Sequence, residues 1–187
     1  MRFRSTLALV TALLLSPAAL PAQKLPSAAS IVKQARTEAA EQNKVVFVVF
    51  TATWCDYCQE FDSYLEMPTV RPIIDKYFVV VHVNVQEELG HHPERNHPGG
   101  ARLLESLGGG EEVPYFALLK ASGGKIADAN APRIGNVGFP EAPEEVDWFM
   151  VAMIEAVPTM TPGELDVLDA ALRKHSWQNA AIGRAQS

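Results

Sequence analysis

Two cysteines stand three residues apart in the stretch Thr53-Trp54-Cys55-Asp56-Tyr57-Cys58-Gln59-Glu60, and they are the only cysteines of this 187-residue chain. An unbroken apolar run at residues 45–50 precedes this stretch and predicts a buried strand. Apolar residues at helical spacing follow it, at Phe61, Tyr64 and Leu65. The cysteine pair is therefore expected at a junction between a strand and a helix.

The start of a helix stabilises a negative charge, because its first backbone N–H groups are unpaired and the positive end of its dipole lies there. A thiolate is such a charge, so Cys55 is expected to be the attacking sulfur. We expect Cys55 to be exposed. Cys58, one turn further on, should be shielded but close enough to form a disulfide with Cys55. The pattern predicts dithiol–disulfide exchange with Cys55 and Cys58 as the catalytic residues.

Two other readings of the cysteine pair need different support. A zinc site needs two further ligands, usually from a second CxxC or a pair of histidines, and this chain has no other cysteine. A purely structural disulfide is also conceivable, but a bridge across so few residues removes little entropy from the unfolded chain. The redox reading is the one that the flanking strand and helix favour.

Composition excludes some classes of function. The net charge is −6, and no basic cluster stands out as a footprint for nucleic acid or for an anionic membrane surface. Nucleic acid is therefore not an expected partner. At this length the chain is expected to form one domain, covering residues 23–187.

The N-terminus has the pattern of a secretory signal peptide. Met1-Arg2-Phe3-Arg4 is positively charged, residues 7–15 are apolar, and small residues and prolines continue to Ala22. The apolar part is too short to span a bilayer. We expect residues 1–22 to be removed, leaving a periplasmic or secreted protein without stable membrane insertion. Disulfides form and persist in such compartments.

Periodicity and turn residues predict the remaining elements. Helices are expected at residues 28–42, 68–76, 101–107 and 144–157, and a last helix from a capping box at residues 161–164 to about 175. Strands are expected at 78–85, 115–120 and 125–129, the last two joined as a hairpin. The nearly continuous apolar run at 78–85 predicts a central strand covered on both faces. Helices on both faces of a mixed sheet, an α/β fold, would accommodate this order.

These motifs resemble the thioredoxin superfamily over residues 28–157. The resemblance rests on Trp54-Cys55-Asp56-Tyr57-Cys58 after a buried strand and on Val113-Pro114 before a hairpin. It is nearest to exported thioredoxin-like proteins that begin with a helix. The resemblance implies a thioredoxin-like fold with an extra C-terminal helical extension at 158–187. It also implies a cis peptide bond before Pro114, and a substrate-binding surface made by Trp54, Val113 and Pro114.

The chain departs from that family in the residues that handle the proton of the second cysteine. Thioredoxins place a buried acid six residues before the first cysteine, where this chain has Val49, and a lysine in a neighbouring strand, where this chain has His82. His82 is therefore a possible proton acceptor for Cys58, although a histidine in an apolar strand is often only structural. Asp56 places a carboxylate beside Cys55 and opposes the helix dipole, so the motif does not set the direction of the reaction.

Three functions remain in view. The leading one is an exported thiol–disulfide oxidoreductase without a cofactor, acting on protein cysteines and recycled by an external redox partner. A thioredoxin-fold binding module would use the Val113-Pro114 groove without turnover. A copper- or zinc-handling protein would use Cys55 and Cys58 together with His91, His92 and His97 of the polar loop, although such a loop is more often simply solvated.

Overall fold

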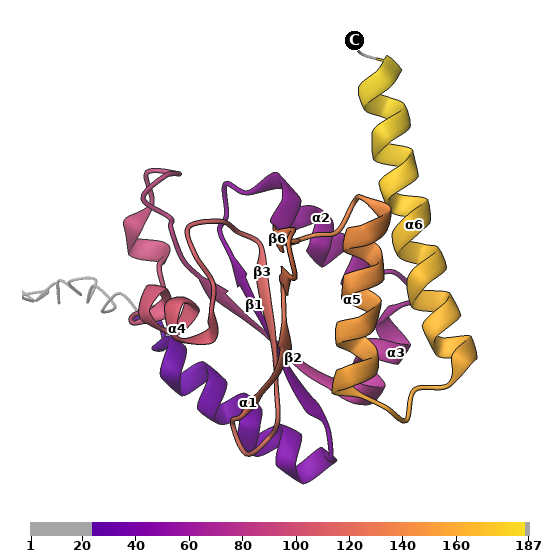
Figure 1. Cartoon of the computed structure of the whole chain (residues 1–187). Coiled ribbons are helices and arrows are strands. Elements are labelled where there is room, and N and C mark those ends of the chain that lie inside the picture. The colour runs from indigo at the N-terminus through magenta and orange to yellow at the C-terminus, as the bar shows by residue number, and fades with distance from the viewer. Residues whose placement is uncertain (1–23, 186–187) are drawn as a thin grey trace, which may run out of the picture.

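A four-stranded mixed sheet forms the centre of the computed structural model, which describes residues 24–185 (Figure 1). Its strands lie in the order β2-β1-β3-β4. They span Phe78–Asn84 (β2), Val45–Thr51 (β1), Tyr115–Leu119 (β3) and Lys125–Asp128 (β4). β1 pairs in parallel with β2 and antiparallel with β3, and β3 pairs antiparallel with β4. The strand that leads into the cysteines is therefore central.

Two helices cover one face of the sheet. α1, Ala28–Gln42, begins at Ser27, whose side chain accepts a hydrogen bond from the Ser30 N–H, and ends at Asn43 in the left-handed conformation. It packs on β1 and β2 and contacts α4, Gly100–Leu107 (Figure 1). The spacing of Ala28, Val32, Ala35 and Ala39 turns one side of α1 inward, and all four are buried.

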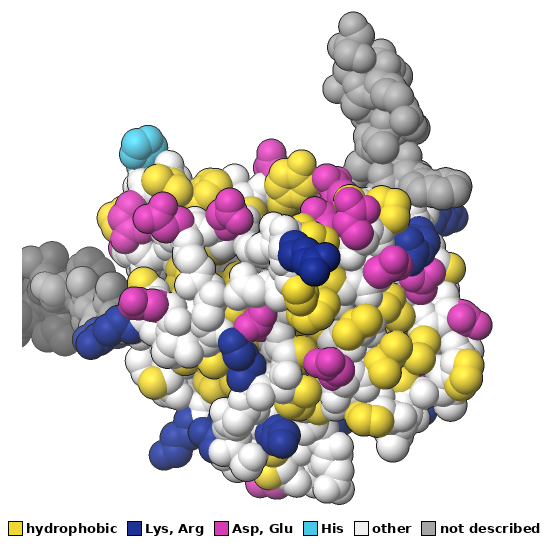
Figure 2. All heavy atoms as spheres, viewed as in Figure 1, with side chains coloured by type: hydrophobic (Ala, Val, Ile, Leu, Met, Phe, Trp, Pro, Cys, Tyr) yellow, Lys and Arg dark blue, Asp and Glu magenta, His cyan; other side chains and the backbone are white. Residues whose placement is uncertain are grey.

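The opposite face carries α2, Asp56–Leu65, α3, Arg71–Tyr77, and α5, Pro143–Ala156 (Figure 1). α6, Pro162–Ala185, packs outside them against α5 and α2. Pro68 and Pro72 separate α2 from α3, because proline suits the first turn of a helix but not its interior. The outer side of α5 leaves aliphatic side chains exposed (Figure 2), including Val151 and Ile154.

Aromatic rings fill the space between the sheet and α2 and α5. Phe61 of α2 lies 6.1 Å from Phe116 of β3 and 6.0 Å from Phe149 of α5, measured between ring centroids. Phe47 of β1 lies 6.0 Å from Phe61, and these four rings are fully buried. Edge-to-face contacts of this kind add to the free energy gained from burial. They fix α2 on the sheet.

Most of the expected elements are confirmed. α1 has the predicted bounds, and α5 begins and ends within one residue of the helix expected at 144–157. The capping box is also present, since the Thr161 N–H donates to Glu164 and the Glu164 N–H donates to Thr161. The α/β fold with a mixed sheet and helices on both faces is as expected.

Three expectations are corrected. The strand at 78–85 was expected to be central, but β2 is an edge strand, because only β1 pairs with it. Helices on both sides cover much of it, which explains its apolar sequence. The segment 131–143, expected to be a loop, contains the short strand β6, Gly135–Asn136. This strand pairs with β5, Asn130–Ala131, in a small hairpin. The last helix continues well beyond residue 175, to Ala185.

The signal peptide expected at residues 1–22 lies outside the described residues. Within residues 24–185, no helix has the length and apolar character needed to cross a membrane.

We expect Leu168→Ala to lower the free energy of unfolding by about 2–5 kcal/mol, because it leaves a cavity beneath α6. Leu168 is fully buried, and its carbonyl accepts a hydrogen bond from the buried Tyr64 hydroxyl of α2. Urea denaturation measures the change. The neighbouring Val167 is 37% exposed, so Val167→Ala is a matched control with an expected change within about 0.5 kcal/mol. Equal losses in the two variants would mean that α6 does not pack as described.

Candidate active site

The two cysteines form a disulfide at the start of α2. Cys55 is the N-cap of this helix, and its Sγ accepts a hydrogen bond from the Cys58 N–H at 3.1 Å. The Cys55 and Cys58 Cα atoms are 5.3 Å apart and the sulfurs are bonded. The strand-to-helix junction predicted from the sequence is therefore present. The same N–H group that caps the helix is available to a Cys55 thiolate in the reduced protein.

Cys55 is not exposed in this disulfide form. Its exposed fraction is 4% and that of Cys58 is 1%. The expectation of an exposed first cysteine is therefore wrong for the oxidised state. The reason is that its sulfur turns inward to cap α2 and packs with Ala52, Cys58 and Val113. Access to the sulfur is limited, so position in the helix, rather than exposure, distinguishes the two cysteines here.

The Val113-Pro114 segment lies directly against the disulfide. The Cys55 Sγ is 3.6 Å from the Val113 carbonyl oxygen, and the peptide bond before Pro114 is cis, as the resemblance implies. Asn136 of β6 donates a hydrogen bond from Nδ2 to the Pro114 carbonyl oxygen at 3.1 Å. A Cβ atom on Gly138 would come within 2.9 Å of that oxygen, so only glycine allows this close approach. The small hairpin that the sequence did not reveal thus supports this segment.

Two aromatic side chains next to the cysteines remain partly open to solvent. Trp54 is 39% exposed and Tyr57 is 54% exposed. The negative charge of Glu141, followed by partial burial, raises the pKa of the Tyr57 hydroxyl above its ordinary value. Figure 2 shows acidic side chains around the end of the molecule where α2 begins. Two partly exposed rings therefore flank the cysteines, and the Glu141 carboxylate lies near one of them.

A loop between β2 and α4 holds Trp54 in place. The Trp54 indole N–H donates to the Gln86 carbonyl oxygen at 2.8 Å. A Cβ atom on Gly90 would lie 2.7 Å from the Trp54 ring, so the ring packs directly on the glycine backbone. This loop is the polar segment in which the sequence indicated only candidate histidines.

Glu87 of the same loop is a buried residue beside the site that the sequence did not reveal. It is fully buried, and its carboxylate accepts hydrogen bonds from the Thr53 N–H at 2.9 Å, the Thr53 hydroxyl at 2.7 Å and Asn84 Nδ2 at 3.3 Å. Arg95 donates to the Thr53 hydroxyl oxygen at 3.1 Å. Thr53 immediately precedes Trp54, so a buried carboxylate fixes the backbone that leads into the cysteines. Glu87 stands between Gln86 and Glu88, and nothing in that run of similar residues distinguishes it.

His82 is not hydrogen-bonded to either cysteine in the described chain. Its Nε2 bonds with Asp62 Oδ1 at 2.7 Å, and its side chain is 41% exposed. Val49, in the position of the usual acid, is fully buried and pairs with His82 in the register of β1 and β2. Asp62 follows Cys58 by one turn of α2, which connects His82 to that helix. A role for His82 as proton acceptor stays a prediction.

The three loop histidines do not converge. His91 is exposed, His92 Nδ1 bonds with Glu94 at 3.2 Å, and His97 Nδ1 accepts the Asn84 N–H at 2.8 Å. Among residues 24–185, no group of three or more histidine, cysteine or acidic side chains is arranged to hold a metal ion.

Residues 28–121 match a family model described as thioredoxin-like. The chain belongs to the thioredoxin-like family. The CxxC motif, the cis proline and the mixed sheet all agree with this family. Comparison with the curated proteins gave no match.

Several solved structures are similar to this thioredoxin-like chain. A disulphide isomerase from Xylella fastidiosa Temecula1 is 24% identical, with a TM-score of 0.46, 58% of this chain covered and 78% of the other. The C-terminal domain of Neisseria meningitidis DsbD in its oxidised form is 20% identical, with a TM-score of 0.44 and coverages of 70% and 99%. A thioredoxin from Thermus thermophilus is 19% identical, with a TM-score of 0.46 and coverages of 75% and 94%.

Replacing Glu87 by glutamine should loosen the backbone before Cys55. A glutamine can keep the oxygen that accepts the Thr53 N–H and Asn84 Nδ2, but its NH₂ group cannot accept the Thr53 hydroxyl proton, so that hydrogen bond must reverse and the stronger bonds to a charged carboxylate are lost. We expect a loss of about 1–3 kcal/mol in the free energy of unfolding and a changed Trp54 emission spectrum. The fluorescence is measured with Trp148 and Trp177 replaced by phenylalanine.

Glu88→Gln is the matched control for this loop. Glu88 is exposed and accepts a hydrogen bond from Asn96 Nδ2 through Oε1, which a glutamine oxygen can also accept. Unchanged stability and emission are expected for this variant. If Glu87→Gln behaved in the same way, the carboxylate would not fix the Thr53–Trp54 backbone.

His97 makes stability depend on pH. Burial lowers the pKa of His97 below its ordinary value of about 6.5, and its Nδ1 accepts the Asn84 N–H, which requires the neutral ring. Below about pH 6.5 the unfolded chain binds the proton more strongly than the folded one, so the stability contributed by the neutral ring is lost as pH falls from there. We expect His97→Asn, which keeps an acceptor but does not titrate, to flatten this dependence in urea denaturation between about pH 7.5 and 5.5. A slope in His97→Asn identical to that of the parent protein would contradict the assignment.

Proposed function

We propose that this protein is an exported thiol–disulfide oxidoreductase that acts on cysteines of other proteins through Cys55 and Cys58. One observation carries the proposal: the Cys55–Cys58 disulfide lies at the first turn of α2, against the carbonyl of Val113 before the cis proline. Membership of the thioredoxin-like family supports it. The charged and apolar pattern at the N-terminus supports export.

The first chemical step is an attack by the reduced protein on a substrate disulfide. The Cys55 thiolate, stabilised by the Cys58 N–H and the helix dipole, attacks one substrate sulfur. A bond forms between Cys55 and that sulfur, the substrate disulfide breaks, and the other substrate sulfur leaves as a thiolate that takes a proton from solvent. The result is a mixed disulfide.

The second step resolves the mixed disulfide. Cys58 loses its proton and attacks the Cys55 sulfur, which releases the remaining substrate sulfur as a thiolate. The protein is left with the Cys55–Cys58 disulfide, and two electrons have passed to the substrate. The same steps in reverse transfer the disulfide to a substrate dithiol. Both directions need an external partner to restore the starting state, because the chain has no third cysteine.

Substrate binding is assigned in this proposal to Trp54, Val113 and Pro114. Trp54 offers a partly exposed ring beside Cys55, and the Val113 carbonyl is already adjacent to the reactive sulfur. An extended substrate segment pairing with the Val113 backbone would bring its own cysteine to Cys55. Hydrogen bonds between backbones do not depend on which side chains the substrate carries. Such pairing therefore suits an enzyme that acts on several proteins.

The proposal predicts different outcomes for the two cysteine variants. Cys58→Ser should accumulate a mixed disulfide through Cys55, because the first step remains and the second is lost. Cys55→Ser should reduce turnover at least ~100-fold and form no such adduct, because the attacking group is absent. Mass spectrometry after acid quenching detects the adduct, and reduction of insulin by dithiothreitol measures turnover. An adduct on Cys58 would overturn the assignment, and a folded wild-type protein without turnover would favour the binding module instead.

A further inference from the structure

Hydrogen bonds at the end of β2 show which way the backbone groups of this strand point. The Val85 N–H donates to the Thr51 carbonyl of β1 at 2.9 Å, so residues with odd numbers face β1. The Asn84 N–H and carbonyl bond instead to His97, on the side away from β1. Backbone groups of successive strand residues alternate between the two sides. The N–H and C=O groups of Val80 and His82 therefore point outward.

These outward groups form a short open edge. At one end of this edge, His97 forms hydrogen bonds with the backbone N–H and carbonyl of Asn84. At the other end, the Phe78 N–H donates to the Ile74 carbonyl oxygen. In the part of the chain that the structure describes, no hydrogen bond reaches the outward backbone groups of Val80 and His82. An edge of this kind is a template for another extended segment. The open stretch suits a segment of about five residues.

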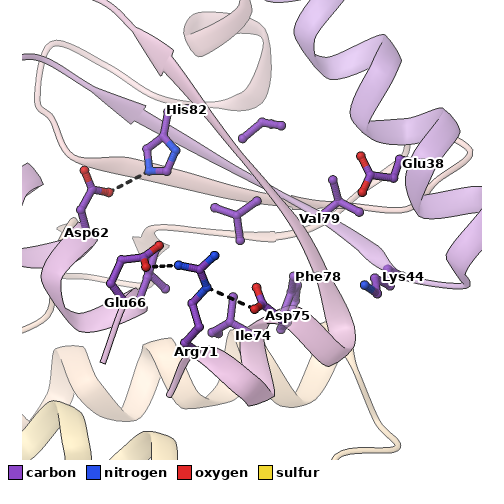
Figure 3. A pocket seen from close by; sticks show the side chains of 13 residues that line it. Glu38, Lys44, Asp62, Glu66, Arg71, Ile74, Asp75, Phe78, Val79 and His82 are labelled. Carbon is purple, nitrogen blue, oxygen red and sulfur yellow. Dashed lines mark hydrogen bonds and ion pairs between the residues drawn. The ribbon is translucent and has the colours of Figure 1, made fainter. Parts of the chain in front are cut away.

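A hollow of about 600 Å³ lies along this edge (Figure 3). In Figure 3, His82 and Asp62 point toward each other, and Arg71 lies between Glu66 and Asp75. Neither cysteine lines the hollow, so it is separate from the candidate active site. Its charged side chains are Glu38, Asp62, Glu66, Asp75, Lys44 and Arg71.

Negative charge is in excess in this hollow. Four carboxylates face two permanently positive groups, and Arg71 is shared by Glu66 and Asp75. Apolar side chains of β2 and α3, among them Val79 and Ile74, lie between the charges. A second copy of this chain paired edge to edge would bring the same carboxylates against one another, which is unfavourable. A segment with lysine or arginine side chains would be attracted.

We propose that the outer edge of β2 binds an extended segment of a partner protein, in which basic residues alternate with apolar ones, as an added strand. Basic side chains of the segment lie toward Asp62, Glu66 and Asp75, on the same face of the sheet as His82. Its backbone pairs with the outward groups of Val80 and His82. This surface would hold a partner independently of the cysteine chemistry.

The probe is a peptide, acetyl-Lys-Val-Lys-Val-Lys-amide, titrated into ¹⁵N-labelled protein, with the glutamate analogue as the control peptide. We expect the basic peptide to shift the amide resonances of Val80 and His82, and the acidic peptide to leave them unchanged at the same concentration. No shift of these resonances by the basic peptide would overturn the proposal. Dimerisation of the free protein through these residues, measured by light scattering, would also overturn it, since a second copy would then occupy the edge.

Val80→Pro tests the backbone pairing. Proline removes only an outward N–H here, so the β1–β2 ladder keeps its bonds. Val80→Thr keeps both the N–H and the branched shape and serves as the control. We expect Val80→Pro to weaken peptide binding about tenfold and Val80→Thr to change it less than about twofold, with insulin reduction unchanged in both. Equal affinities in the two variants would refute strand addition.

Charge reversal on α3 provides a test that does not depend on proline being tolerated. Asp75 of α3 and Glu41 of α1 are both exposed, but only Asp75 lines the hollow, on the face of the sheet where the basic side chains of the segment lie. Asp75→Lys should weaken binding of the basic peptide several-fold at low salt, whereas Glu41→Lys, with the same change in net charge, should have little effect. Equal effects of the two changes would mean that only the overall charge attracts the peptide.

Discussion

The packing of Phe61 against Phe116 and Phe149 is the contact on which the arrangement of the cysteines depends. Phe61 lies one turn after Cys58 on α2, and its ring is fully enclosed by rings from β1, β3 and α5. Such contacts leave little freedom for α2 to shift along the sheet. The first turn of α2, where Cys55 caps the helix, is consequently held against Val113 and the end of β1.

A second constraint is polar and acts on the other side of Cys55. Burying the Glu87 carboxylate costs free energy unless donors satisfy it, and Thr53 and Asn84 supply three hydrogen bonds. The apolar packing beneath α2 and the polar network before Cys55 meet at Trp54. Its ring is held by the Gln86 carbonyl and by the glycine backbone at Gly90. The residues flanking the disulfide are thus held in place by contacts within the chain.

The loop that contains Glu87 also shapes the outer edge of β2. His97 terminates that edge by bonding to Asn84, and burial lowers the pKa of its ring, which favours the neutral form. One loop therefore contacts both the backbone before Cys55 and the end of the open edge of β2. The hollow along that edge nevertheless has no cysteine in its lining. Two surfaces of different character result: one holds the disulfide among apolar side chains, and the other is charged and bounded by unpaired backbone groups.

Local features of the sequence were sufficient for the elements and for the cysteine pair. The apolar run at 45–50, the spacing after Cys58, the cap at Ser27 and the capping box at Thr161 each act within a few residues, so periodicity and cap chemistry predicted them. The fold class and the position of Val113-Pro114 came from the resemblance that these motifs carry, and the family match confirms the fold.

Tertiary structure decided what depends on residues distant in the chain. When helices cover both of its faces, a strand has the same apolar sequence at the edge of a sheet as at its centre. The structure identified β2 as an edge strand because β1 is the one strand that pairs with it in the described chain. Glu87 differs from Glu88 solely in facing Thr53, 34 residues away, and Cys55 is buried because its sulfur turns toward Val113, 58 residues away. The sequence by itself identified the cysteine pair and its place between a strand and a helix. Long-range packing decided which carboxylate is buried, how open the sulfur is and which strand edge stays unpaired, because burial and pairing are properties of neighbours in space.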